Sequence, residues 1–321
     1  MNVEFESFEK LLQAAGDLPA MSIAVIDADE LHVVEGACKA AEAGYIDPVL
    51  IGDEAVIRDL LMILNCTKEF RIIHAPDDDA MAEKGVELIE SGQVKALMKG
   101  HIHTDEFLHP ILAHHMQGKK RISHVFLADL KTYPKLLYIT DAAININPGL
   151  SAKVGIVQNA IDMSLIMGVD VPKVAVLSAV EVVNPAIPST IDAACLAKMA
   201  ERGQITGGIV DGPLAFDNAI SAESAQLKGL KSPVSGDVDI LVVPDLVSGN
   251  ILAKDLEYLA GARLAGSVMG TKVPIVLTSR SDPVDARVIS CAVAALISSR
   301  MTSKSDLVRT VRGRSATPLC Q

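Results

Sequence analysis

Hydroxyl, guanidinium and carboxylate side chains lie together near the end of the chain, directly after a short apolar run. The run spans residues 273–277, and Ser279, Arg280, Asp282 and Asp285 follow it. Such a run predicts a strand buried on both faces. Ligands bind at the carboxyl ends of strands in open α/β sheets, so these side chains form a candidate site. The alternative is a solvated turn in which Asp282 and the following proline only begin the next helix.

Four other predicted strands also end in polar residues. The residues at the four strand ends are, in chain order, Lys99, Gly100 and Thr104; Asp141 and Asn145; Asp211; and Asp245, Ser248, Gly249 and Asn250. A glycine permits close approach of a backbone, and free amides at a helix start bind anions, with a lysine adding charge. The same residue types also serve as ordinary helix caps and tight corners, so both interpretations stay open at this point.

Histidines are concentrated in one region, which suggests a metal site as one alternative. Six of the eight fall between residues 101 and 124. His101 and His103 would share a face of an extended segment, and histidine-rich tracts bind transition metals. The later ones lie on an expected helix at unsuitable angles, without HExxH spacing or a cysteine partner. We therefore predict no metal site and interpret these histidines as surface or loop residues.

Composition argues against several classes of function. A formal charge of −11, a pI near 5.2 and 3% aromatic residues without tryptophan disfavour nucleic-acid binding. Five widely spaced cysteines without a CxxC pair are typical of reduced cytosolic thiols. The acidic N-terminus lacks an apolar signal core, and no apolar run reaches membrane-spanning length, so we expect a cytoplasmic chain without a membrane partner. Neither a dinucleotide fingerprint nor a P-loop is present.

The elements that must position these side chains alternate between strands and helices. This alternation predicts right-handed βαβ units and a mostly parallel sheet, and the length of the chain favours two α/β lobes. A helix is expected from residue 251 through Gly261, Gly266 and Gly270, and a last helix at 284–299. The strands are expected at 21–26, 49–51, 71–74, 96–98, 121–130, 136–140, 173–177, 209–211, 239–243 and 273–277.

Three long strings in the chain resemble the phosphate acetyltransferase and phosphate butyryltransferase family. They are Gly-Gly-Ile-Val-Asp-Gly-Pro-Leu-Ala-Phe-Asp-Asn-Ala-Ile-Ser from Gly207, Val-Pro-Asp-Leu-Val-Ser-Gly-Asn-Ile-Leu-Ala-Lys from Val243, and Pro-Ile-Val-Leu-Thr-Ser-Arg-Ser-Asp from Pro274. The resemblance extends from residue 15 to residue 300 and includes the segments around Lys99 and Asp141.

The resemblance implies a two-domain, three-layer α/β/α fold with mostly parallel sheets, similar to the isocitrate and isopropylmalate dehydrogenases, with a cleft between the domains. The first domain would comprise residues 1–126 plus 268–321, the second residues 127–267, and residues 302–321 would form a mobile tail. The implied reaction converts acyl-CoA and inorganic phosphate reversibly to acyl phosphate and CoA. Coenzyme A is then a substrate, no cofactor is tightly bound, and a homodimer is expected.

The residues after the last strand suit that reaction. The nucleophile that makes acyl-CoA is the CoA thiolate, so a carboxylate must take the thiol proton, and Asp285 is the first choice. Arg280 would hold phosphate through its planar guanidinium, and Ser279 would donate to an oxygen that gains charge. Asp285 matches the family only if one residue is deleted, so Asp282 remains a rival for the base.

Two further departures from the family pattern distinguish this chain. Ala142 stands where many acetyltransferases of the family carry cysteine, so a thiol there is not essential, and His109 replaces an expected phosphate-binding arginine. The corner at Asp141 resembles the butyryltransferase branch. Two alternatives remain open at this point: an NAD-dependent decarboxylating dehydrogenase on a similar fold, and a non-catalytic small-molecule-binding relative.

Overall fold

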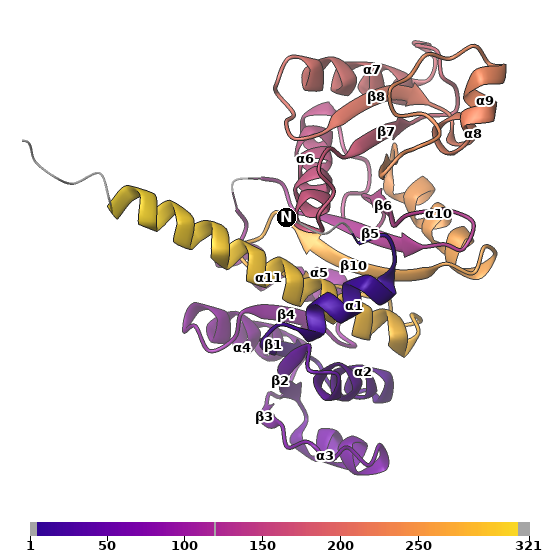
Figure 1. Ribbon diagram of the computed structural model, residues 1–321. Helices are drawn as coiled ribbons and strands as arrows, with labels where there is room; N and C mark the ends of the chain where they lie inside the picture. The colour runs from indigo at the N-terminus through magenta and orange to yellow at the C-terminus, as the bar shows by residue number, and fades with distance from the viewer. Residues whose placement is uncertain (1–4, 119, 314–321) are drawn as a thin grey trace, which may run out of the picture.

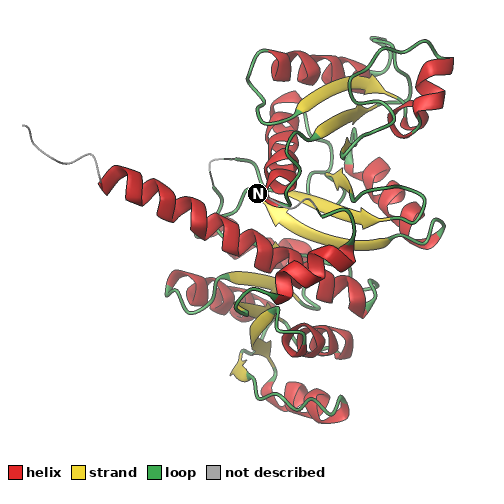
Figure 2. Ribbon diagram, in the orientation of Figure 1, coloured by secondary structure: helices red, strands yellow, loops and turns green. Residues whose placement is uncertain are grey.

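One continuous sheet forms the centre of the molecule. The computed structural model describes residues 5–118 and 120–313, and its eleven described strands follow the order β3-β2-β1-β4-β11-β10-β5-β6-β9-β7-β8 (Figures 1 and 2). Their bounds are β1 Met21–Ile26, β2 Ile46–Gly52, β3 Arg71–His74, β4 Ala96–Lys99, β5 Ser123–Asp129, β6 Leu137–Thr140, β7 Lys173–Leu177, β8 Ile209–Leu214, β9 Ile240–Val242, β10 Arg263–Met269 and β11 Ile275–Val276. The expected mostly parallel α/β architecture is confirmed, in a sheet that also contains antiparallel pairs.

The strand directions change at the middle of the sheet. β11 runs parallel to β4, but β10 is antiparallel to both β11 and β5, and β5 is antiparallel to β6. Strands β6, β9, β7 and β8 are mutually parallel. They therefore run opposite to β1, β2, β3, β4 and β11. The polar ends of the predicted strands consequently do not meet at one common edge of the sheet.

Helices cover both faces of this sheet and complete three layers. Shared apolar clusters place α1, α2, α3, α6, α7 and α11 on one face and α4, α5, α8 and α10 on the other. Their bounds are α1 Phe8–Gly16, α2 Leu31–Glu42, α3 Glu54–Ile63, α4 Asp78–Glu90, α5 Thr104–Ala113, α6 Leu150–Ile166, α7 Pro188–Glu201, α8 Phe216–Ile220, α9 Ala222–Leu227, α10 Leu246–Tyr258 and α11 Val284–Gly313. Among the described residues, no helix is both long and apolar enough to cross a bilayer.

The first and second halves of the chain meet at the central strands. In Figure 1, α11 crosses the middle of the molecule and projects beyond it. The proposed domain boundaries at 126/127 and 267/268 fall inside β5 and β10, respectively. The division into two domains therefore stays a prediction. The similarity to the isocitrate and isopropylmalate dehydrogenases also stays a prediction.

The largest error in the predicted elements concerns residues 261–270. They were expected to continue a helix, but α10 ends at Tyr258 and residues 263–269 form β10. Residue 266 must be a glycine because the His124 side chain of β5 fills the space beside it: a Cβ atom at this position would lie 2.5 Å from the His124 ring. Close packing thus accounts for Gly266 and for Gly270, where a Cβ atom would lie 2.4 Å from the Arg121 carbonyl oxygen, but not for Gly261, which has no neighbour within 4 Å. Beside Gly266, the ring of His124 lies against that of Phe126 with centroids 4.3 Å apart.

Three smaller differences change the placement of candidate residues. Asp211 lies inside β8, which continues through Pro213 rather than ending at the acid. Helix α10 begins at Leu246 instead of 251, so Ser248, Gly249 and Asn250 belong to its first turns. Helix α11 extends to Gly313, into the expected tail, and residues 314–321 of that tail lie outside the described residues.

Candidate active site

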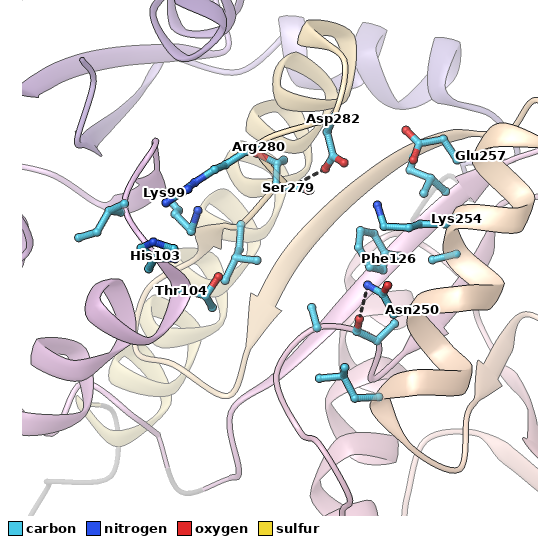
Figure 3. Close-up of a pocket in the computed structure, with 18 residues that line it drawn as sticks. Lys99, His103, Thr104, Phe126, Asn250, Lys254, Glu257, Ser279, Arg280 and Asp282 are labelled. Carbon is cyan, nitrogen blue, oxygen red and sulfur yellow. Dashed lines mark hydrogen bonds between the residues drawn. The ribbon is translucent and has the colours of Figure 1, made fainter. Parts of the chain in front are cut away.

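A cavity of about 370 Å³ opens between α5 and α10, over the central strands. Three segments supply its polar walls: the end of β4 with the start of α5, the residues after β11, and one side of α10 (Figure 3). The side chains of Phe126 in β5 and Leu264 in β10 contribute apolar surface. From the sequence, ligands were expected at strand ends alone. The cavity is also lined by one face of the antiparallel strands β5 and β10.

Pairing between β4 and β11 brings two cations together. Ile275 is level with Leu97 and Val276 with Met98, so the chain leaves β11 beside Lys99. Lys99 is 4% exposed, and its Nζ lies 3.3 Å from the Gly100 carbonyl oxygen. Burial, together with the positive charge of Arg280, lowers the pKa of Lys99 to about 8. Figure 3 shows the Arg280 side chain extending toward Lys99. Two neighbouring cations with few anionic partners are suited to a multiply charged anion.

Close packing of the backbone holds Lys99 in place. The amide of Gly100 donates to the Ile26 carbonyl oxygen at 2.8 Å. A Cβ atom at Gly100 would lie 2.0 Å from the Asp27 carbonyl oxygen, so only glycine fits this crossing of β1 and β4. Thr104 then begins α5 and lines the cavity, although the residue in the cap position is His103.

Ser279 and Asp282 close a tight turn directly after β11, on the same side of the cavity as Lys99. The amide of Ser279 donates to Asp282 Oδ2 at 2.7 Å, and the amide of Asp282 donates to the Ser279 carbonyl oxygen at 3.2 Å. The Ser279 and Ser281 hydroxyl oxygens are 3.1 Å apart. Burial raises the pKa of Asp282, and the hydrogen bond from Ser279 and the charge of Lys254 act in the opposite direction. A half-buried carboxylate of this kind is suited to accept a proton.

Helix α10 contributes Asn250, Lys254 and Glu257 to the cavity. Figure 3 shows Glu257 facing Asp282 across the cavity, with Lys254 between them. Burial and the charge of Asp282 raise the pKa of Glu257. Lys254 and Glu257 were not predicted as site residues, because two charges three residues apart are also typical of an exposed helix surface. His103 and Phe126 were not predicted to line the cavity either, since no spacing signal distinguishes them.

Several predicted site residues serve the local backbone instead of lining this cavity. Asp141 accepts hydrogen bonds from the amides of Ala143 and Ile144 at 3.0 and 3.1 Å, and from that of Asn145 at 3.2 Å. The Asn145 side chain also donates to Asp141, and to the Ile122 carbonyl oxygen at 3.0 Å. These bonds shape the corner that presents Ala142 and Ala143 to the cavity.

The start of α10 is built in a similar way. Asp245 caps the helix, accepting from the Ser248 amide at 2.9 Å and from the Ser248 hydroxyl at 3.0 Å. Gly249 lies against the corner: a Cβ atom there would be 3.0 Å from that of Ala142. Asn250 alone of the predicted group lines the cavity, and its Nδ2 donates to the Ala142 carbonyl oxygen at 3.4 Å.

Asp285 and Asp211 are placed elsewhere. Asp285 is exposed at the start of α11 and lines an adjacent hollow with Tyr258 and Arg263. The carboxylate of Asp211 accepts a local hydrogen bond, from the Gly212 amide at 2.9 Å. The cavity thus brings together Lys99, Thr104, Asn250, Ser279, Arg280 and Asp282. It does not include Asp211 or Asp285.

The histidines of residues 101–124 are dispersed. His103 lines the cavity, His124 is buried with Nε2 3.1 Å from the Leu277 carbonyl oxygen, and His114 pairs with Glu83 and Glu90. Among the side chains that the structure describes, no group of three or more His, Cys, Asp or Glu is arranged to hold a metal ion.

Comparison with known proteins links the chain to one set of enzymes. The family model described as phosphate acetyl/butaryl transferase matches residues 71–295. A phosphate acetyltransferase of Rhizobium meliloti is 51% identical over 297 residues, covering 91% of this chain and 94% of the relative. A phosphate butyryltransferase of Clostridium beijerinckii is 38% identical over 298 residues, covering 92% and 99%, respectively.

Solved structures give the same result. A branched-chain phosphotransacylase from Enterococcus faecalis matches with a TM-score of 0.75 and 30% identity, covering 87% of this chain and 99% of that one. A phosphotransacetylase from Streptococcus pyogenes matches with a TM-score of 0.77 over 92% and 99%, and at 23% identity it supports the fold alone.

Proposed function

Because the chain belongs to the phosphate acetyl/butyryl transferase family, we propose that it transfers an acyl group between coenzyme A and inorganic phosphate. The observation that carries this proposal is the meeting of Lys99 and Arg280 with the turn of Ser279 and Asp282 in one cavity. An anion site thus lies beside a half-buried carboxylate. The named relatives are acyltransferases, so the dehydrogenase alternative receives no support from them.

The phosphate subsite lies between Lys99 and Arg280. The guanidinium offers paired donors for two phosphate oxygens, and the ammonium adds a point charge. Among the described residues, Lys99 Nζ has a single hydrogen-bond partner, the Gly100 carbonyl oxygen at 3.3 Å. Its remaining protons are therefore available to phosphate.

The thiol proton goes to Asp282 in this proposal, rather than to Asp285. Asp282 lines the cavity, whereas Asp285 is exposed outside it. Asp282 takes the proton of the CoA thiol, and the sulfur attacks the carbonyl carbon of the acyl phosphate. The Ser279 hydroxyl donates to the oxygen that gains negative charge. The C–O bond then breaks, and phosphate leaves with its charge held by Lys99 and Arg280.

The remaining predicted residues have two kinds of role in this proposal. Thr104 and Asn250 line the cavity and contact substrate. Outside it, Asp141 and Asn145 shape one wall, and Asp245, Ser248 and Gly249 fix the start of α10. Asp211 stays a prediction. Both acetyl and butyryl donors are within the proposal, since relatives of both kinds match this chain.

The assembly is proposed to be a cytoplasmic homodimer that needs no tightly bound cofactor. Helix α10 carries apolar side chains on its exposed side, including Val247 at 61% and Ile251 at 56% exposure. Exposed apolar surface of this kind favours association between chains. Light scattering after size-exclusion chromatography would give twice the chain mass if the proposal is correct.

The test of the reaction follows free thiol with the purified chain: acyl-CoA with phosphate should release the CoA thiol, and acyl phosphate with CoA should consume it. Turnover must require phosphate in one direction and acyl phosphate in the other, and must be indifferent to NAD. A comparison of acetyl-, propionyl- and butyryl-CoA then gives the chain-length preference. Absence of turnover with all three would contradict the proposal.

A further inference from the structure

Arg287 is the largest fully buried side chain of the described residues, and it lies close to the proposed reaction centre without entering the cavity. It is 1% exposed, near the start of α11. Among the side chains that the structure describes, none forms a salt bridge with its guanidinium, and the carboxylate charges that act on it, those of Asp282 and Glu30, do so from beyond ion-pair distance. Burying an unpaired charge is costly, and apolar residues of similar volume often give a more stable protein. Stability alone therefore does not account for an arginine here.

The guanidinium holds both ends of the turn that carries Ser279 and Asp282. Nη1 donates to the Asp282 carbonyl oxygen at 2.7 Å, and Nη2 donates to the Ser279 carbonyl oxygen at 3.1 Å. The turn is closed on its other side by the bond from the Ser279 amide to Asp282 Oδ2 at 2.7 Å. A rigid planar fork between two carbonyl groups fixes their separation, which a flexible ammonium cannot do.

A glycine on α2, far from Arg287 in the sequence but in contact with it in the fold, makes room for this side chain. Gly36 lies in α2, and a Cβ atom added there would be 3.1 Å from both Cβ and Cδ of Arg287. Contacts of that length force the neighbour to move, and the neighbour here is the stem of the arginine. A methyl group at Gly36 would therefore push the stem of Arg287 by a few tenths of an ångström and shift the guanidinium relative to the two carbonyl oxygens.

We propose that Arg287 is a positioning residue that holds residues 279–282 in the shape needed for acyl transfer, and that Gly36 permits this packing. The inference rests on the proposed function, because the turn carries the proposed base, the hydroxyl donor and Arg280. Arg287 would act by fixing where the turn holds the proposed base Asp282 and the hydroxyl of Ser279. Displacement of such groups by about 1 Å can cost on the order of 100-fold in rate.

The test uses Arg287→Met, Arg287→Lys and Gly36→Ala, with Gly16→Ala as the matched control. A Cβ atom at Gly16, in α1, would meet only a Tyr45 carbon at 3.9 Å, an ordinary contact. Arg287→Met is expected to fold with an unchanged or higher melting temperature, while kcat falls by roughly 100-fold and KM for phosphate changes by less than about fivefold. Gly36→Ala and Arg287→Lys are expected to lose roughly tenfold in kcat, and Gly16→Ala to lose nothing.

Hydrogen exchange separates this inference from the proposed function. The peptide that covers residues 279–282 is expected to exchange roughly tenfold faster in Arg287→Met than in the unchanged chain, because the turn loses two of its bonds. If the unchanged chain shows no turnover, the proposed function fails, and the exchange result still decides the role of Arg287. Unchanged exchange in this peptide would overturn the inference. Unchanged kcat in an active enzyme would also overturn it.

Discussion

Lys99→Met is expected to make the folded protein more stable and the phosphate site weaker at the same time. Burial, with Arg280 nearby, lowers the pKa of Lys99 from 10.5 to about 8. At about 1.36 kcal/mol per pH unit, that difference corresponds to roughly 3 kcal/mol. Below pH 8 the folded chain must hold a charged ammonium that the unfolded chain solvates freely. The resulting destabilisation is fully present there and disappears as the pH rises toward 10.5.

The free energy of unfolding measured in urea should therefore increase by roughly 3 kcal/mol at pH 7 in Lys99→Met, and by less than about 1 kcal/mol at pH 10. Phosphate binding, measured by calorimetry without CoA, should weaken in the same variant at pH 7, and by less at pH 10, where Lys99 of the unchanged chain is mostly neutral. In the unchanged chain, Kd for phosphate should rise about tenfold between pH 7 and pH 9, because above pH 8 binding must first protonate Lys99.

Lys99→Arg is the matched control, since a guanidinium stays charged over this whole range. Its Kd for phosphate should show no loss of affinity between pH 7 and pH 9. Two results would refute the reasoning about Lys99. One is lower stability of Lys99→Met than of the unchanged chain at pH 7. The other is the same rise in Kd in Lys99→Arg as in the unchanged chain.

Three further predictions concern the base and the sheet beneath the cavity. Asp282→Asn should lower kcat by about 100-fold or more and Asp285→Asn by less than about twofold, measured as thioester formation; the reverse order would make Asp285 the base. Lys254→Met removes a cation that opposes the raised pKa of Asp282, so the acidic limb of the kcat/KM profile should move to higher pH. An unmoved limb would separate Lys254 from the base. Gly266→Val should destabilise the fold by about 2 kcal/mol or more in urea unfolding, through the clash with His124; unchanged stability would contradict the packing at β10.

Local patterns in the sequence were sufficient for many individual strands. Residues 21–26, 71–74 and 173–177 were predicted with the bounds that the structure has, because each is a short run rich in β-branched residues between polar turns. The pairing of these strands was only partly accessible. An alternation of strands and helices indicates parallel units, but the antiparallel β10 depends on contacts with β5 across more than a hundred residues.

The lining of the cavity was predictable where one motif carries several polar side chains. Ser279, Arg280 and Asp282 follow a single strand, so their meeting in one cavity could be anticipated from the order of residues. Lys254 and Glu257 could not be, because their helix approaches the turn only in the folded chain. The choice between Asp282 and Asp285 also depended on the direction in which α11 leaves the turn.

The order in which the sheet is synthesised differs from its order in space. β10 and β11 come from residues 263–276, close to the end of the chain, yet they lie in the middle of the sheet between β4 and β5. A nascent chain that ends before residue 263 therefore leaves β4 and one side of β5 without these neighbours. Open strand edges promote pairing between chains, so the emerging protein is most prone to aggregation just before its central strands leave the ribosome.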